Sequence, residues 1–388
     1  MRVIGLMSGT SADGVDAALV EWGEADSGRP FRLLAFRETP FDARFQARIH
    51  RLAAGRTEPG ETLRELATLD VELGEIFARA AEDVARVAGV ALADVDAIAS
   101  HGQTVAHHPE RRATLQIGDP SVIAERSGCT TIADFRTRDV AAGGEGAPLA
   151  PFFHYAAFAS KQENRLVLNL GGIANVTWLP AGADSDRVTA VDVGPANALV
   201  DGVVQAFTRG EERMDRDGRL AAAGTVDDLL LARLLEDDYL ARRPPKSTGR
   251  ERYGSDQADA LAREWNEAGR PLQDLVATLV AFTVEAIARA ARDHLEGGPV
   301  ERLLVGGGGA RNPAVMAALA HALPGAAVEP LDAQGVPADA AEAMAFSLMG
   351  RNTLLGLPNH LPHTTGARHE AVLGEIVPGK DGRIRRGP

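Results

Sequence analysis

Short apolar runs recur along the first third of the chain and are separated by polar, glycine-containing segments. The first two runs, Val3–Met7 and Val15–Val20, flank a linker of glycines, hydroxyl side chains and an aspartate. Runs this short with such a linker predict a strand, a tight polar turn and a returning strand. Four further runs predict strands, at residues 31–38, 95–99, 114–117 and 130–133. We expect the polar residues 100–104 to form a loop.

Helical periodicity separates these predicted strands. Apolar side chains recur every three or four positions over residues 61–87, which predicts a long amphipathic helix that Gly89 ends. Asp119 and Pro120 are typical of an N-cap and first helical position, so a second helix is expected to run to about Ser127. Strands that alternate with helices indicate a mostly parallel sheet covered by helices, which is an α/β fold.

A comparable pattern restarts in the second half of the chain. Residues 165–179 again predict strand, glycine turn and strand, and residues 188–193 predict a third strand. Residues 209–257 are charged and contain prolines, and we expect short helices and an exposed loop there. The remaining elements expected are helices at 195–207, 272–295, from Pro313 and at 338–355, and a buried strand at 303–305.

Two α/β halves that each open with a glycine-turn hairpin suggest a duplicated architecture with a cleft between the halves. We expect residues 1–145 to form the first half and residues 146–388 the second. The last helix and the tail could pack back against the first half.

Composition narrows the possible partners and compartment. The formal net charge of −13 over 388 residues argues against a nucleic-acid partner and against an anionic membrane surface. Cys129 is the single cysteine, so no disulfide forms within the chain, which fits a reducing compartment; we expect it to be a small buried residue. No secretory signal is expected at the N-terminus, and no apolar run reaches the length of about 18 residues that a membrane helix needs.

Two glycine-rich turns are candidate anion sites. At residues 9–16, glycines permit close backbone approach to a phosphate and hydroxyls add donors, but an ordinary hairpin loop explains the pattern equally well. Gly306 to Gly309 lie between a predicted strand and a helix, where a phosphate or a flat ring would meet no side chains. The spacing of neither turn is that of a dinucleotide fingerprint or a P-loop, so nucleotide binding would use another fold.

Several polar residues follow predicted strands. Asp192 ends a strand, where ligand crevices form in open α/β sheets; it is a candidate general base, an indirect magnesium partner or a turn aspartate. His101 and Gln103 are candidates for hydrogen bonds to a sugar, although a loop histidine is more often satisfied by the backbone. Arg136 and Arg138 would clamp an anion or pair with nearby aspartates. The histidines lack metal-ligand spacing, so no zinc site is predicted.

Taken together, these segments resemble the anhydro-N-acetylmuramic acid kinase family, whose members are sugar kinases of the actin/hexokinase/Hsp70 type. The matching stretches follow one another in order along nearly the whole chain, at residues 5–16, 101–104, 115–120, 133–136, 141–149, 171–175, 246–250, 307–313 and 342–346. Any one stretch is weak evidence, whereas the ordered set is highly specific.

The resemblance implies a two-domain actin-like, ribonuclease H-like fold and a cytoplasmic, homodimeric enzyme of peptidoglycan recycling. Such an enzyme uses ATP and Mg²⁺ to convert 1,6-anhydro-N-acetylmuramate and water to N-acetylmuramate 6-phosphate. Asp192 would be the base that activates the water. The nucleotide would be held by Gly9, Thr10, Ser11, Ala12, Asp13, Gly14, Val15, Asp16, Gly171, Gly172, Gly307, Gly308 and Gly309. The sugar would lie near His101, Gln103, Arg136, Asn197 and Glu342, the last of which could also be a solvated helix charge.

One departure from the family pattern leaves alternatives open. Val193 and Ala196 stand where the family usually has Thr and Gly, close to the retained Asp192 and Asn197. A lost hydroxyl and an added methyl could redirect the enzyme to another sugar or sugar acid. A different class, a non-catalytic ATP-binding switch protein of the same fold, is also consistent with the glycine turns, although the retained Asp192 argues against it.

Overall fold

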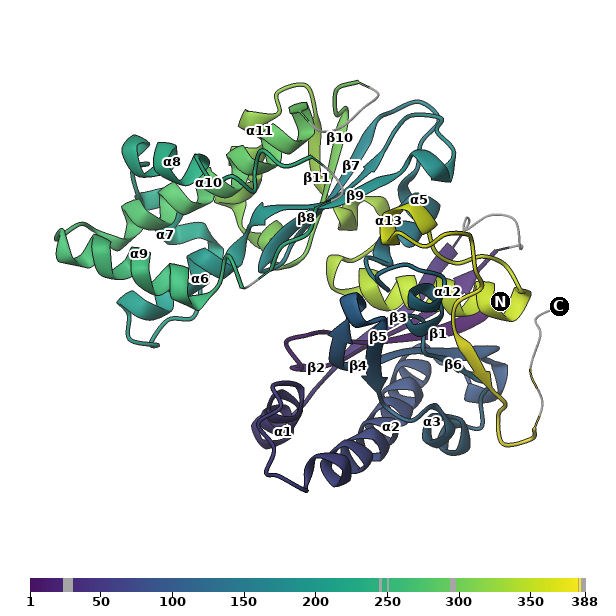
Figure 1. Ribbon diagram of the computed structural model, residues 1–388. Helices are drawn as coiled ribbons and strands as arrows, with labels where there is room; N and C mark the ends of the chain where they lie inside the picture. Colours follow the sequence, from purple (N-terminus) through teal and green to yellow (C-terminus); the bar gives the residue numbers. More distant parts are fainter. Residues whose placement is uncertain (24–30, 244–245, 250, 294–297, 383, 385–388) are drawn as a thin grey trace. The chain divides into compact units, whose positions relative to one another are not determined.

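The computed structural model describes residues 1–23, 31–243, 246–249, 251–293, 298–382 and 384. It divides into two compact units (Figure 1). Unit 1 consists of Met1–Ala157 together with Ala340–Pro388, and unit 2 consists of Phe158–Asp339. Each unit is built on its own mixed β-sheet with helices packed against it.

The sheet of unit 1 starts with an antiparallel meander. Strands β1 (Arg2–Ser8), β2 (Gly14–Trp22) and β3 (Phe31–Pro40) pair in sequence order. Strand β4 (Ala97–His108) lies parallel to β1, and β6 (Thr131–Ala133) lies parallel to β4. The sheet is completed by β12 (Glu375–Val377), which runs antiparallel to β6, and by β5 (Ala113–Ile117), which pairs with the outer part of β4.

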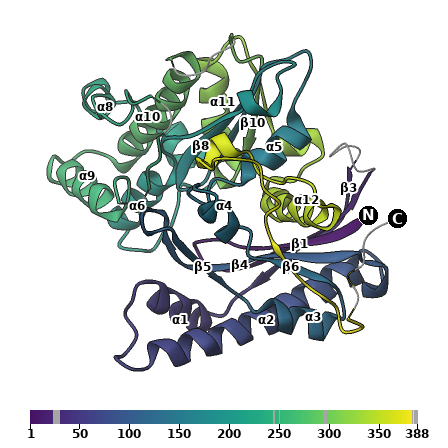
Figure 2. The same cartoon turned by 45° about the vertical axis from the view of Figure 1, so that its right-hand side comes forward.

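Helices cover the sheet of unit 1 on both faces (Figure 2). Helix α2 (Thr62–Val87) packs on β2 and β3 and contacts α3 (Pro120–Ser127), whereas α12 (Ala341–Leu355) packs on β1, β2 and β4. As predicted, the Asp119 carboxylate caps α3 by accepting from the backbone N–H of Ser121 at 2.7 Å. The shorter helices of this unit are α1 (Ala43–Ala53), α4 (Thr137–Ala141), α5 (Ala150–Phe158) and α13 (Pro362–Thr365).

Unit 2 repeats the arrangement. Its meander consists of β7 (Arg165–Leu170), β8 (Ile173–Leu179) and β9 (Thr189–Pro195), and β10 (Arg302–Gly306) and β11 (Ala327–Pro330) add parallel to β7. The helices are α6 (Asn197–Phe207), α7 (Arg219–Ala223), α8 (Asp228–Leu235), α9 (Ser255–Glu267), α10 (Leu272–Asp293) and α11 (Pro313–Ala322). Helix α10 packs on β9 and contacts the other five.

Both sheets share one strand order, in which the first three strands form the meander and the next two are parallel. That order is β3-β2-β1-β4-β6 in unit 1 and β9-β8-β7-β10-β11 in unit 2. It is the ribonuclease H-like arrangement that the family resemblance implies, so the predicted α/β, actin-like fold class is confirmed. Most predicted elements also agree with the structure; residues 294 and 295 of one predicted helix lie outside the described residues.

The predicted loop at residues 100–104 is wrong, because these residues continue strand β4. Gly102, with φ of +73°, marks an irregularity at which β4 extends beyond its pairing with β1 and pairs with β5 instead. Glycine adopts such a conformation without a steric cost, so the polar stretch bends and remains a strand.

The boundaries of the two structural units differ from the expected boundary between residues 145 and 146. Residues 146–157 belong to unit 1, where the Phe153 ring lies 6.4 Å from the Phe31 ring of β3. The last helix α12 and the tail also belong to unit 1.

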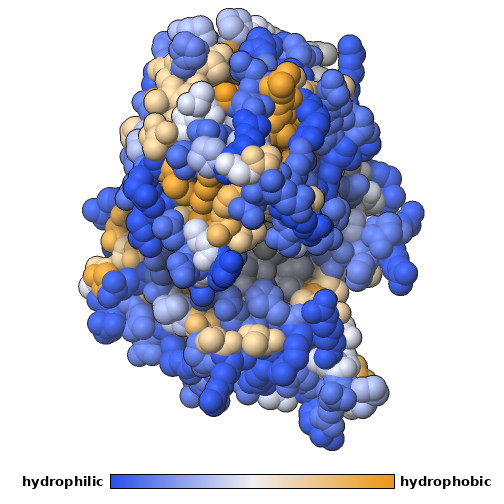
Figure 3. All heavy atoms as spheres, turned by 90° about the vertical axis from the view of Figure 1, so that its left-hand side faces the viewer, coloured by the Kyte–Doolittle hydropathy of each residue, from blue (hydrophilic) through white to orange (hydrophobic). Residues whose placement is uncertain are grey.

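Among the described residues, no helix has both the length and the apolar character needed to cross a membrane. The face of the molecule in Figure 3 is mostly hydrophilic, with scattered apolar patches.

Candidate functional site

The turn between β1 and β2 presents backbone and hydroxyl groups at its tip. Thr10, Ser11 and Asp13 are exposed, and a Cβ added to Gly9 would meet only the Ser11 hydroxyl, at 3.9 Å. Ala12 has a positive φ of +48° and donates its N–H to the Gly9 carbonyl at 3.0 Å, which closes the turn. Ala12 and Val15 are fully buried and the Ala12 N–H is bonded within the turn, so these two predicted nucleotide-site residues shape the turn and present no exposed surface of their own.

His101 and Arg136 form a polar pair in unit 1. Arg136 donates Nε–H to His101 Nε2 at 2.9 Å, and His101 Nδ1 lies 2.9 Å from the Gly102 carbonyl. Since Nε2 accepts, Nδ1 carries the proton and the ring is neutral. Burial, together with the Arg136 charge, lowers the pKa of His101 to about 3. The predicted sugar residue His101 is therefore held as a neutral imidazole, packed against the Phe346 ring at 4.7 Å.

Arg136 remains a cation within this pair. Desolvation lowers the pKa of Arg136 to about 10, and the charges of Glu342 and Asp139 oppose that shift. Its Nη1 also donates to the Gly146 carbonyl at 2.6 Å. Glu342 interacts electrostatically with Arg136 and keeps contact with solvent. The structure therefore groups His101, Arg136 and Glu342 in one cluster of unit 1.

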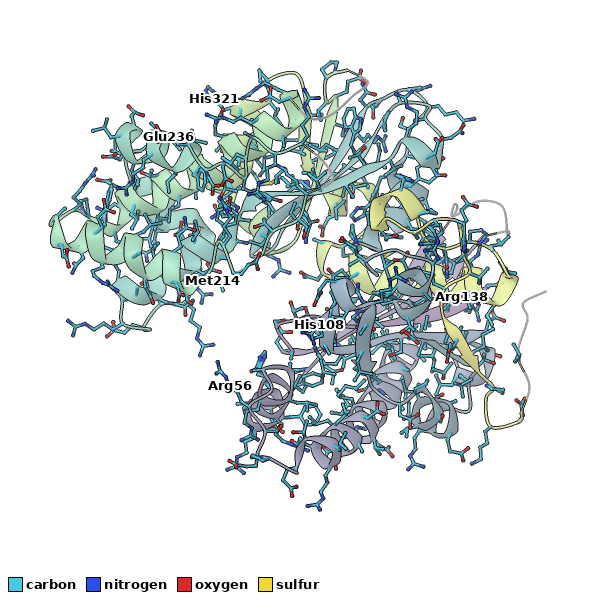
Figure 4. All side chains as sticks on the ribbon, viewed as in Figure 1. Arg56, His108, Arg138, Met214, Glu236 and His321 are labelled. Carbon is cyan, nitrogen blue, oxygen red and sulfur yellow. The ribbon has the colours of Figure 1, made fainter. Side chains whose placement is uncertain are left out.

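Gln103, two residues after His101, makes different contacts from those of His101. Its amide contacts Ser8 and Gly9 at the start of the β1–β2 turn. Arg138, the second candidate clamp, is exposed, as is His108 (Figure 4).

Asp192 lies in the middle of β9 in unit 2 and not at its end as predicted, because the strand continues to Pro195. It is beside a register shift between β8 and β9. Such irregularities re-aim the neighbouring side chains and are common next to active sites. One carboxylate oxygen, Oδ2, accepts the backbone N–H of Thr248 at 3.0 Å. Partial burial raises the pKa of Asp192, with the Thr248 hydrogen bond opposing the rise. A carboxylate with a raised pKa is a stronger base.

An aromatic and basic cluster holds the segment that contacts Asp192. Tyr239 donates its hydroxyl to the Asp192 carbonyl at 2.7 Å, and Lys246 Nζ lies 4.7 Å from the centre of the Tyr239 ring. Lys246 Nζ also donates to the carbonyls of Tyr239 and Leu240. Desolvation lowers the pKa of Lys246. These contacts place Thr248, two residues after Lys246, against the Asp192 carboxylate. Arg250, the last residue of the matching stretch 246–250, lies outside the described residues.

The turn between β7 and β8 closes on the start of helix α6. The Gly171 carbonyl accepts from the N–H of Asn197, and the Gly172 carbonyl accepts from the N–H groups of Ala196 and Ala198, at 3.0–3.1 Å. The Asn197 amide side chain donates to the Leu170 carbonyl at 3.0 Å. The predicted Gly171, Gly172 and Asn197 are thus brought together, and the first amides of α6 are already bonded to the turn.

The glycines after β10 pack against the same turn. A Cβ on Gly307 would lie 2.5 Å from the Asn169 side chain, and one on Gly309 would lie 2.6 Å from Leu170. Gly308 has nothing within 4 Å and is exposed. Glycine is therefore required at 307 and 309 by packing, whereas the open surface that a ligand needs lies at 308.

No group of three or more His, Cys, Asp or Glu side chains in the described part of the chain could hold a metal ion. Cys129 is buried, as predicted, and contacts the Leu92 carbonyl at 3.3 Å.

Comparison with known proteins identifies the family. Residues 1–379 match the family described as anhydro-N-acetylmuramic acid kinase. The chain belongs to this family. A relative named anhydro-N-acetylmuramic acid kinase from Caldanaerobacter subterraneus subsp. tengcongensis is 40% identical over 383 residues, which cover 96% of each chain. Relatives of the same name from Gloeobacter violaceus and Streptomyces coelicolor are 44% and 43% identical and cover 97% and 98% of this chain, and 98% and 95% of their own. The resemblance found in the sequence is confirmed.

The two residues near Asp192 that differ from the usual family pattern, Val193 and Ala196, can be located in the structure. Val193 and Ala196 are both buried within the apolar core of unit 2, together with Ala174 and Val191. Val193 therefore packs into the core, while Asp192 is partly exposed.

Several residues around the predicted base are not among the site residues predicted from the sequence. Tyr239 and Thr248 bond to Asp192, although 47 and 56 positions separate them from it. Asn175 is the register partner of Asp192, and Asn169 is the partner of Asn175. These two asparagines are polar positions in mostly apolar strands, and that signal could have found them.

Proposed function

We propose that the protein is an ATP-dependent kinase that opens the 1,6-anhydro ring of 1,6-anhydro-N-acetylmuramic acid and phosphorylates O6. The products are N-acetylmuramate 6-phosphate and ADP, and the process served is peptidoglycan recycling. Besides family membership, the observation that carries the proposal is Asp192, a partly buried carboxylate with a raised pKa and one oxygen held by a backbone N–H.

Asp192 acts as the general base. A water oxygen forms a bond to the anomeric carbon while the bond between that carbon and O6 breaks, and a water proton passes to the Asp192 carboxylate. The released O6 takes the γ-phosphoryl group of ATP. The hydrogen bond from Thr248 fixes Oδ2, so the carboxylate keeps its orientation while Oδ1, which accepts no hydrogen bond from the described residues, faces the water.

The predicted substrate-binding residues keep the roles that the family resemblance implies. The turn from Gly9 to Asp16 binds the ATP phosphates through backbone N–H groups and hydroxyls, and Gly171 and Gly172 help to hold them. Gly307 to Gly309 accept the adenosine. His101, Arg136, Asn197 and Glu342 serve the sugar. Arg136 remains protonated, so its charge suits the lactyl carboxylate of the muramic acid.

Magnesium is expected to enter with ATP. Mg²⁺ keeps several waters and is usually bound by substrate phosphates and one or two carboxylates, which fits a protein whose described residues offer no cage of acidic side chains. The exposed Asp13 on the β1–β2 turn is a carboxylate of the right kind. Bound there, the ion would neutralise charge on the transferring phosphoryl group.

The departure from the family pattern at Val193 and Ala196 leaves a second candidate, a kinase of the same family type that acts on another sugar acid, although both residues lie in the core of unit 2. We further propose a cytoplasmic location and a homodimer, which fractionation and sedimentation equilibrium would test.

The deciding experiment follows oxygen during turnover. Protein, ATP, Mg²⁺ and 1,6-anhydro-N-acetylmuramate are incubated in H₂¹⁸O, and the product is analysed by mass spectrometry before anomeric exchange. We expect a sugar 6-phosphate with ¹⁸O at the anomeric hydroxyl and a loss of turnover of at least about 10³-fold in Asp192→Asn. The matched control Asp228→Asn alters an exposed carboxylate of the same unit and should keep wild-type turnover.

Binding of ATP without conversion of this sugar would contradict the substrate assignment and favour the second candidate. Wild-type turnover in Asp192→Asn would contradict the role of the base.

A further inference from the structure

Gln103 is a buried amide, and its hydrogen bonds to the described residues all stay within unit 1. It lies on β4 and is 1% exposed. Its Oε1 accepts from the Ser8 hydroxyl at 2.7 Å, and its Nε2 donates to the carbonyls of Gly9 at 3.1 Å and Thr104 at 3.3 Å. Both ends of the amide are thus occupied by protein, which leaves little capacity for a sugar.

The backbone of β4 explains why Gln103 and His101 serve different groups. The pairing of β1 with β4 changes register between Leu6 and Ser8, and Ser8 is paired with Gln103. Gly102, with its positive φ, lies inside this irregularity. As a result, His101 bonds to Arg136 while Gln103 reaches the turn that follows β1.

Ser8 joins Gln103 to both arms of the turn. Its hydroxyl lies 2.7 Å from the Gly14 carbonyl as well as from Gln103 Oε1, and the side chain is 1% exposed. The one Ser8 hydroxyl proton is shared between these two acceptors. The turn therefore has a buried polar anchor at its base, where Ser8 and Gly9 contact Gln103 and Ser8 also contacts Gly14. At its tip, Gln46 Nε2 donates to the Ser11 carbonyl at 3.0 Å.

We infer that Gln103 is a positioning residue of the β1–β2 turn and not a contact of the sugar. The inference rests on the proposed binding of ATP phosphates by Gly9 to Asp16. Backbone donors bind a phosphate well only when they are held in place beforehand, because ordering them on binding costs affinity. Loss of the amide would remove the hydrogen bonds that tie Ser8 and Gly9 to β4. The Ser8 hydroxyl would keep the Gly14 carbonyl and the Gly9 carbonyl would keep the Ala12 N–H, so the turn would stay closed but would lose its anchor to the sheet and loosen.

The test separates the affinities for the two substrates. Gln103→Met keeps the length of the side chain but removes its hydrogen bonds. Calorimetric titration of the full chain should give a Kd for a non-hydrolysable ATP analogue that is about tenfold weaker than in the wild type. The Kd for 1,6-anhydro-N-acetylmuramate should stay within about twofold. Gln116→Met is the matched control, because Gln116 bonds to Thr104 and Thr114 and not to the turn.

A second variant, Ser8→Ala, keeps Gln103 but removes its partner, so it should also weaken nucleotide binding selectively and serves if Gln103→Met does not fold. Weaker sugar binding with unchanged nucleotide binding would show that Gln103 contacts the sugar and would overturn the inference. Equal weakening of both substrates, or of neither, would overturn it as well. A wild-type protein that binds no nucleotide would instead contradict the proposed function.

Discussion

His101 illustrates how burial and one hydrogen bond decide the chemistry of a single residue. In the sequence it is a histidine in a polar stretch, either a candidate for a hydrogen bond to a sugar or, more commonly, a loop histidine satisfied by the backbone. In the structure its Nε2 accepts from Arg136, which requires the neutral ring. Proton transfer by His101 near neutral pH is therefore disfavoured, and a role in shaping the cluster is favoured.

The first prediction concerns the pH dependence of stability. The pKa of His101 is about 3 in the folded protein and near 6.5 when unfolded, so between these values the unfolded chain binds more protons. Stability should therefore fall as the pH is lowered below about 6.5. Between pH 7 and pH 5, the titration of His101 should lower the free energy of unfolding by about 2 kcal/mol. Hydrogen exchange of β1 and β4 amides measures that free energy in unit 1.

In His101→Gln the wild-type loss between pH 7 and 5 should shrink by that amount. The control His108→Gln replaces an exposed histidine of the same strand and should keep the wild-type slope. An unchanged slope in His101→Gln would contradict a buried neutral ring.

At the scale of elements, helix α12 is positioned by a glycine more than 330 positions earlier. A Cβ on Gly5 of β1 would lie 1.8 Å from the Ala343 carbonyl oxygen and 2.6 Å from the Ser347 N, both backbone atoms of α12. The Ser347 hydroxyl adds a hydrogen bond to the Val3 carbonyl at 2.8 Å and accepts one from Trp22 at 2.9 Å. The backbones of α12 and β1 therefore lie in direct contact, which leaves no room for a side chain at position 5.

The second prediction tests this contact. Gly5→Ala should displace α12 and reduce the stability of unit 1 by about 3 kcal/mol, because backbone atoms cannot move aside as a side-chain tip can. Urea unfolding followed by circular dichroism would measure the loss. Gly9→Ala, at an open position of the following turn, is the control and should change stability by about 0.5 kcal/mol or less. Equal stability of the two variants would contradict the close packing.

At the scale of the whole molecule, the two units differ in how the chain builds them. Unit 2 is one continuous segment with its own apolar core, whereas unit 1 needs both ends of the chain. The tail is tied in by polar contacts as well. His360 and Thr365 both hydrogen-bond to the buried Asp139 carboxylate, and Gly146 donates to its other oxygen.

The third prediction follows from this difference. A fragment of residues 158–339 should fold by itself and unfold cooperatively, because its core and its sheet are complete. A fragment of residues 1–157 should lack cooperative unfolding, because removal of α12 exposes the apolar face of β1, β2 and β4. Calorimetry of the two fragments beside the full chain would measure this. A cooperative transition in the first fragment would contradict the dependence on residues 340–388.

Local patterns predicted the elements that depend on local forces. The stripe of α2, the Asp119 cap of α3 and the glycine-turn hairpins all lie within spans of a few turns, where periodicity and capping act. The outer half of β4 was missed because polar residues in a strand look like a loop until β5 provides the pairing partner. Strand β12, with three residues, has too little pattern to be recognised.

By itself, the sequence determined the α/β class, the repeated hairpin design, the family and the set of candidate residues, since each depends on residue types and their order. Only the tertiary structure decided which candidates meet. It joined Gln103 to the β1–β2 turn and His101 to Arg136, and it brought Thr248 to Asp192 across 56 positions. Those pairings depend on strand register, burial and backbone geometry, which are set by contacts between segments far apart in the chain.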